Sequence, residues 1–86
     1  MTLNKTTKEY LRQYREALLA RHCLAATIGK DPLEARNRVW AAENNLRHSV
    51  KAGSKTDQAL TREIFRLHKH VSSLSPQQAL EELYNN

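Results

Sequence analysis

Four histidines and one cysteine are the residues of this chain that could serve as catalysts or metal ligands. His22 and Cys23 are adjacent and His68 and His70 are two residues apart, so on a helix the members of each pair point in different directions. A nucleophile and its base must lie within hydrogen-bond reach, and histidines that share a metal on one helix face are three or four residues apart. Nothing in the sequence singles out His48. We therefore predict no enzyme activity, no metal and no cofactor.

Length and composition indicate one small helical domain over residues 1–86. The 86 residues suffice for a single modest core. The chain holds only two glycines and two prolines, which favours helices, and two glycines are too few for a glycine-rich phosphate loop. A lone cysteine fits a reducing compartment. No apolar run approaches the length of a membrane span, and the N-terminus lacks the apolar core of a signal peptide. We therefore expect a cytoplasmic protein that does not enter a membrane.

The segment 31–53 carries the clearest signals for a helix, which we place over about 32–52. Asp31 suits the cap, Pro32 the first helical position and Glu34 the first turn, while Gly53 suits the residue that follows a helix. One apolar stripe recurs every three or four positions: Ala35, Val39, Ala42, Leu46 and Val50.

Three further helices complete an all-α bundle. A capping box from Thr6 to Glu9 opens a helix over about 7–28, which Gly29 ends. Ser54 caps a helix over about 57–73 and Ser75 a short one over about 76–84. We expect helices 32–52 and 57–73 to form an antiparallel hairpin, with helix 7–28 packed on it and helix 76–84 docked. Residues 1–5 and 85–86 are expected to fray.

The apolar faces of these three helices follow from the same periodicity. That of helix 57–73 has the most regular spacing: Leu60, Ile64, Leu67, Val71 and Leu74. That of helix 7–28 comprises Tyr10, Leu11, Tyr14, Ala17, Leu18, Leu24, Ala25 and Ile28. The short last helix presents Leu80, Leu83 and Tyr84.

Arg21 interrupts the apolar face of helix 7–28. A buried arginine without a partner is costly, so Arg21 must pair with a carboxylate such as Glu43, extend its stem to the edge, or face a ligand. The opposite side of the helix carries a stripe of mostly charged residues: Lys8, Arg12, Arg15, Leu19 and His22. We interpret this stripe either as a solvated face, with Leu19 exposed, or as a nucleic-acid-binding edge through Lys8, Arg12 and Arg15.

Two aromatic residues lie off the apolar stripes and beside basic residues. Trp40 has Arg36 and Arg47 as helical neighbours, and Phe65 is flanked by a basic set: Arg62, Arg66 and Lys69. Each aromatic either covers the edge of the core or anchors a partner, because tryptophan and arginine dominate the residues that carry binding energy at interfaces.

The formal net charge of +5 and a pI near 9.7 favour acidic partners. The leading hypothesis is a small non-enzymatic regulator, an adaptor or inhibitor, that binds the acidic surface of a larger protein. Our concrete expectation for that partner is a component of nucleic-acid-processing machinery. Direct DNA or RNA binding is the first alternative, and a homo-oligomeric helical assembly is the second.

Overall fold

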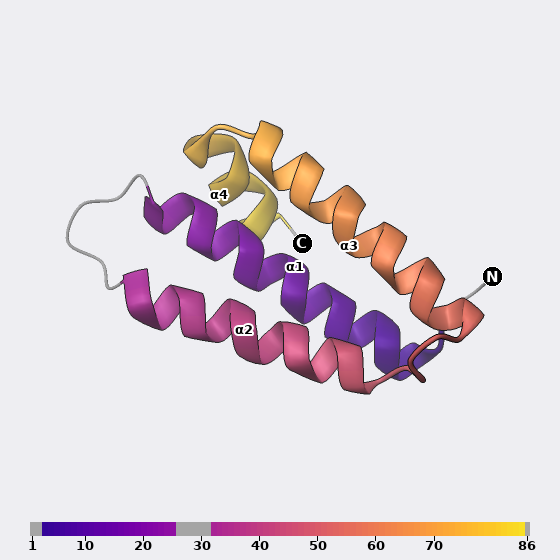
Figure 1. The fold of residues 1–86 in the computed structure, drawn as a ribbon. Helices are drawn as coiled ribbons and strands as arrows, with labels where there is room; N and C mark the ends of the chain where they lie inside the picture. Colours follow the sequence, from indigo (N-terminus) through magenta and orange to yellow (C-terminus); the bar gives the residue numbers. More distant parts are fainter. Residues whose placement is uncertain (1–2, 26–31, 86) are drawn as a thin grey trace.

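The computed structural model describes residues 3–25 and 32–85, which contain four helices and no strand (Figure 1). Helix α1 comprises Lys5–Ala25, α2 Pro32–His48, α3 Lys55–Ser73 and α4 Pro76–Tyr84. The predicted all-α bundle is therefore confirmed. None of the helices in the described ranges combines the length and the apolar character that a membrane crossing requires.

Helix α1 is the central element of the bundle. It lies between α2 and α3, and it packs closely against α2 and α4 and less extensively against α3 (Figure 1). Helices α2 and α3 run in opposite directions, as the predicted hairpin requires. Their backbones approach each other at few positions, however, because α1 separates them. The apolar stripes of α2 and α3 and side chains of α1 nevertheless belong to one buried cluster.

Side-chain caps set the ends of the helices. The Oδ1 atom of Asn4 accepts a hydrogen bond from the backbone N–H of Thr7 at 2.8 Å, so α1 starts at Lys5 and the predicted capping box from Thr6 is wrong. The predicted caps of α3 and α4 are confirmed: Ser54 accepts from the N–H of Asp57, and Ser75 forms a complete capping box. The cap and turn predicted at 28–31 lie outside the described residues.

Helix α2 ends earlier than predicted. Its last helical residue is His48 rather than a residue near 52, and the Oγ of Ser49 donates to the carbonyl of Leu46 at 2.6 Å. This local bond satisfies a backbone oxygen that the next helical turn would otherwise have used. Gly53 has a positive φ of 78°, as its place in the turn predicts, and it lies immediately before the cap of α3.

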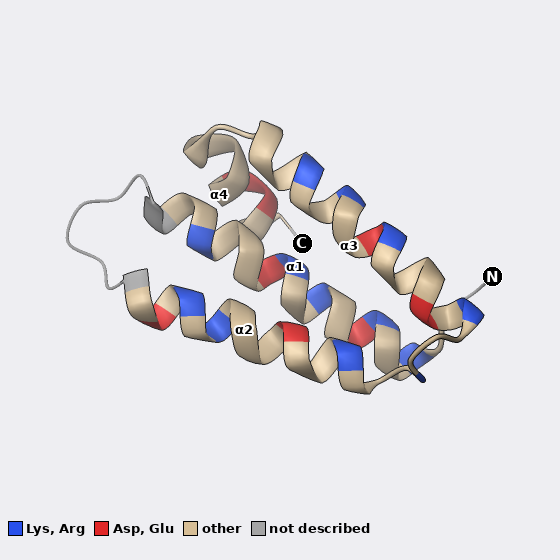
Figure 2. Ribbon diagram, viewed as in Figure 1, with Lys and Arg blue, Asp and Glu red and all other residues tan. Residues whose placement is uncertain are grey.

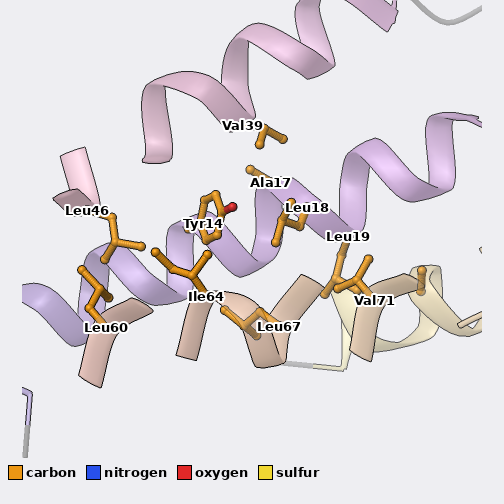
Figure 3. Packing of buried hydrophobic residues seen from close by; sticks show 11 residues of the cluster. Tyr14, Ala17, Leu18, Leu19, Val39, Leu46, Leu60, Ile64, Leu67 and Val71 are labelled. Atoms are coloured by element: carbon orange, nitrogen blue, oxygen red, sulfur yellow. The ribbon is translucent and has the colours of Figure 1, made fainter. Parts of the chain in front are cut away.

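The core is one cluster of buried side chains that all four helices supply (Figure 3). The predicted stripes of α2 and α3 are confirmed, since their buried members are Ala35, Val39, Leu46, Leu60, Ile64, Leu67 and Val71. From α1 come Tyr14, Ala17, Leu18 and Leu19. The side chains of Leu24 and Ala25, predicted for the same face, lie outside the described residues.

Two predictions about burial are wrong, and both concern the contact between α1 and α4. Leu19 is 0% exposed, although the sequence placed it among charged residues on a solvated face. Ala79, also fully buried, and the partly buried Leu83 form the inner side of α4, whereas Leu80 and Tyr84 are exposed. Both errors have the same cause. The apolar periodicity assigns one buried side to α1, but α4 packs against another side of α1, which the sequence analysis assigned to solvent.

The Leu19→Ala substitution tests this packing. We expect it to lower the free energy of unfolding by about 2–5 kcal/mol, because it removes a fully buried leucine side chain and leaves a cavity. The measurement is a urea denaturation curve followed by circular dichroism. Leu33→Ala is the matched control, since Leu33 is exposed and its loss should change stability by no more than about 0.5 kcal/mol. Equal effects of the two substitutions would contradict the docking of α4 on α1.

Candidate functional site

Trp40 and Phe65 are the aromatic side chains that α2 and α3 leave exposed, at 68% and 73% of their surface. Each follows a buried residue by one position, Val39 in α2 and Ile64 in α3, and is therefore turned by about 100° from that residue in the same rotational sense. Because α2 and α3 run in opposite directions on either side of α1 (Figure 1), this rotation brings both aromatics to the same side of the three-helix layer. We call this side the aromatic face.

Trp40 lies among polar and charged neighbours of its own helix. Arg36 precedes it by four residues and is exposed, and in the described ranges the structure contains no ion pair of Arg36. Arg47 follows by seven residues and contacts Glu43, with its guanidinium nitrogen 3.0 Å from the carboxylate. The two arginines predicted beside Trp40 are therefore both exposed on α2. No carboxylate within the described chain neutralises the charge of Arg36.

The basic residues predicted around Phe65 separate into two groups. Arg62 and Lys69, three residues before and four after Phe65, are exposed and form no ion pair with the described part of the chain. Arg66 instead lines a groove between α3 and α1, where it contacts Glu63 at 2.8 Å. The sequence pattern could not separate them, because all three lie within four residues of Phe65.

A side-chain hydrogen bond joins α1 to α3. The hydroxyl oxygen of Tyr14 lies 2.5 Å from Nε2 of His68, which follows Phe65 by three residues. Burial raises the pKa of the Tyr14 hydroxyl above its ordinary value, and the charge of Glu43 raises it further, against smaller opposite effects of Arg47 and Arg21. Tyr14 is thus neutral near neutral pH.

Arg21 reaches the surface by extension of its side chain. It is exposed, and Glu43, its expected partner, pairs with Arg47 instead. The guanidinium stays close enough to Tyr14 to affect its pKa. The prediction of an Arg21–Glu43 ion pair is therefore wrong, while the alternative of an extended stem agrees with the structure.

The opposite side of the three-helix layer holds α4 and its ionic contacts. Arg15 of α1 contacts Glu82 of α4 at 2.8 Å, and Nε2 of His70 of α3 lies 2.8 Å from the same carboxylate. The hydrogen bond from His70 is the main cause that holds the pKa of Glu82 below its ordinary value, and Arg15 lowers it further. One carboxylate thereby ties three helices together.

Beside this contact lies the α1–α3 groove, which has a volume of about 490 Å³. Its walls carry Lys8, Arg12 and Arg15 of α1 and Arg66 of α3, and its apolar floor consists of Leu11 and Leu67. The fold therefore brings the three residues predicted as a nucleic-acid-binding edge next to Arg66. Sequence reasoning missed this groove, because two helices far apart in the chain form it.

Acidic neighbours compensate the charge of this groove. Arg12 contacts both Glu9 and Glu16, Arg15 contacts Glu82, and Arg66 contacts Glu63. Figure 2 shows acidic and basic residues interleaved along α1. A phosphate chain laid along the groove would meet carboxylates as well as cations, which disfavours binding by counterion release.

The residues that sequence reasoning examined for catalysis take part in structural contacts. Nε2 of His22 lies 2.8 Å from the backbone carbonyl of Leu74, and Sγ of Cys23 lies 3.5 Å from that of Pro76. Burial raises the pKa of the Cys23 thiol, which disfavours the reactive thiolate. Within residues 3–25 and 32–85, no three histidine, cysteine or acidic side chains converge on a point where a metal could bind.

Comparison with known proteins gives no relative from which a function could be transferred. No family model matches the chain. Neither the curated proteins nor the solved structures contain a match.

The Tyr14→Phe substitution measures the hydrogen bond to His68. We expect it to lower the free energy of unfolding by about 0.5–1.5 kcal/mol, the net contribution of one such bond, while the ring continues to fill the core. Tyr10→Phe is the matched control, because Tyr10 is only partly buried and no hydrogen bond of its hydroxyl is present in the described chain. If both variants unfold at the same urea concentration, the Tyr14–His68 bond does not stabilise the fold.

The lowered pKa of Glu82 makes the docking of α4 pH-dependent. Its contribution to stability is fully present above the unfolded value of 4.5 and is lost as the pH falls through the lower folded value. We therefore expect Glu82→Gln to destabilise the protein at pH 6 and to have little effect in acid well below that folded value. Thermal unfolding at a series of pH values measures this, with Glu81→Gln on the same helix as the control. A constant difference between wild type and Glu82→Gln across this series would contradict the assignment.

Proposed function

We propose that this protein is a non-enzymatic binding module that regulates a larger protein by docking its aromatic face on an acidic surface. The observation that carries the proposal is the exposure of Trp40 and Phe65 on one side of the molecule. Exposed apolar surface that gathers on one side of a protein is a feature of protein-interaction sites. Tryptophan is among the residues that supply most of the binding energy at protein interfaces.

The charge around these two aromatics supports an acidic partner. Arg36 beside Trp40, and Arg62 and Lys69 beside Phe65, form no ion pair with the described part of the chain. Uncompensated cations at the rim of an interface attract an acidic surface and increase the rate of association. Proteins that process nucleic acid often present such surfaces, and a regulator of one of them, as adaptor or inhibitor, is the form of function that we propose.

Two alternatives remain as outcomes of the test. Direct nucleic-acid binding has less support than protein binding, because carboxylates compensate the predicted edge at Lys8, Arg12 and Arg15 in part. A homo-oligomer would bury the aromatic face against a second copy of the chain. Light scattering at micromolar concentration separates this case from a monomer.

The Trp40→Ala substitution tests the proposal in two steps. Because Trp40 is 68% exposed, we expect its loss to change the free energy of unfolding by less than about 1 kcal/mol, compared with about 3–5 kcal/mol for a buried tryptophan. In an affinity capture from nuclease-treated lysate, we expect the wild-type chain to retain a stoichiometric protein that Trp40→Ala loses.

The matched control is Tyr84→Ala. Tyr84 is 78% exposed but belongs to α4, on the other side of the three-helix layer, so its loss removes a similar aromatic without touching the aromatic face. The proposal requires that Tyr84→Ala retain the captured protein. It fails if both variants retain the same proteins, or if only nuclease-sensitive material is captured.

A further inference from the structure

The α1–α3 groove has the features of a binding site that is separate from the aromatic face. Its floor of Leu11 and Leu67 offers apolar surface between two helices, and its volume of about 490 Å³ can accommodate one aliphatic side chain with the backbone that carries it. Lys8 and Arg12 stand on the α1 wall and Arg66 on the α3 wall. The α3 wall also carries Glu63 and His70, so the lining holds four cations, Lys8, Arg12, Arg15 and Arg66, and one carboxylate. An apolar strip with this excess of basic side chains at its edges is complementary to a segment that is apolar at its centre and acidic on both sides.

The ion pairs at the rim of the groove can be exchanged for those of a ligand. Arg12 is half exposed in its contacts with Glu9 and Glu16, and Arg66 is 73% exposed in its contact with Glu63. Exposed pairs of this kind contribute only about 0–1 kcal/mol, so a carboxylate of a ligand can replace one of them at little cost. Lys8 forms no ion pair with the described residues and is available without any exchange.

The same rim distinguishes between two kinds of acidic ligand. A nucleic acid carries regularly spaced phosphates along its whole length and would meet the carboxylates of Glu9, Glu16 and Glu63. A peptide carries separate carboxylates on rotatable side chains, which can reach the cations and avoid these groups. It also supplies the apolar side chain that the floor requires.

We propose that the α1–α3 groove binds an acidic peptide segment of a partner protein, with a leucine-like side chain on Leu11 and Leu67 and flanking carboxylates on Lys8, Arg12 and Arg66. This site is independent of the aromatic face, because α3 carries Phe65 and Arg66 on different sides. The protein can therefore hold two ligands at once, which is what an adaptor requires.

The experiment is a titration of the full chain into a fluorescein-labelled peptide in which one leucine is flanked on each side by two glutamates. We expect saturable binding at low salt that weakens as the salt concentration rises. The double variant Lys8→Glu/Arg66→Glu should weaken binding at least about tenfold, because each ligand carboxylate then meets a negative charge. Arg66→Gln, which cannot disturb the fold by charge repulsion, should give a smaller loss in the same direction.

Matched controls separate a specific site from general attraction to a basic protein. Arg38→Glu/Lys51→Glu makes the same change of net charge on exposed positions outside the groove and should leave the affinity within about twofold. A peptide with serine in place of leucine should bind at least about tenfold more weakly, because it cannot use the apolar floor. Trp40→Ala should bind the leucine peptide as tightly as wild type, whether or not the aromatic face has the function proposed for it.

Three results would overturn the proposal. The first is the absence of saturable binding, and the second is equal weakening by the control pair. The third is equal affinity for the serine peptide, which shows that the floor takes no part. As a direct check, the amide resonances of Leu11 and Leu67 should shift on addition of the peptide, while the indole resonance of Trp40 should not.

Discussion

The burial of α1 on several sides is the constraint on which the rest of the structure depends. A helix packed by α2, α3 and α4 must present apolar side chains around most of its circumference, and α1 does so with Tyr14, Ala17, Leu18 and Leu19. Its charged residues are then confined to the strips between neighbouring helices. A cation that is shielded from water there needs an ionic partner, because an unpaired buried charge costs free energy, whereas the exposed Lys8 and Arg21 remain solvated. The pairs of Arg12 and Arg15 with nearby glutamates meet this requirement.

This constraint explains which parts of the fold could be predicted from the sequence. Helices α2 and α3 bury one stripe each, so the spacing of their apolar residues identified Val39, Leu46, Ile64 and Val71 correctly. The caps of α3 and α4 depend only on nearby residues and were equally predictable. The same method failed for Leu19, because a periodicity of 3.6 residues finds one buried side and α1 has several. It failed for α4 because a helix of nine residues contains too few turns to define its stripe.

The candidate site could likewise be predicted from the sequence only in part. That Trp40 and Phe65 share one side could have been derived from the sequence, since each follows a residue of a buried stripe by one position in helices of opposite direction. Their exposure could not, because it depends on where α1 and α4 lie. The position of Arg66 in the α1–α3 groove could not be derived either, for the same reason. A residue one position away from an aromatic can line a different surface, and only the position of α1 decides which.

The ion pairs determine which part of the net charge of +5 is available to bind a partner. The first thirty residues carry the largest share of the positive charge in the sequence, yet the arginines of α1 at positions 12 and 15 are paired with Glu9, Glu16 and Glu82. Among the described residues, the cations without such pairs include Arg36, Arg62 and Lys69 beside the exposed aromatics and Lys8 at the rim of the α1–α3 groove. Long-range attraction is set by the total charge, but short-range binding depends on cations that are free to pair. The fold therefore leaves part of the available positive charge beside Trp40 and Phe65 and part at the rim of the α1–α3 groove. This arrangement favours a defined protein surface over the uniform charge of a nucleic acid.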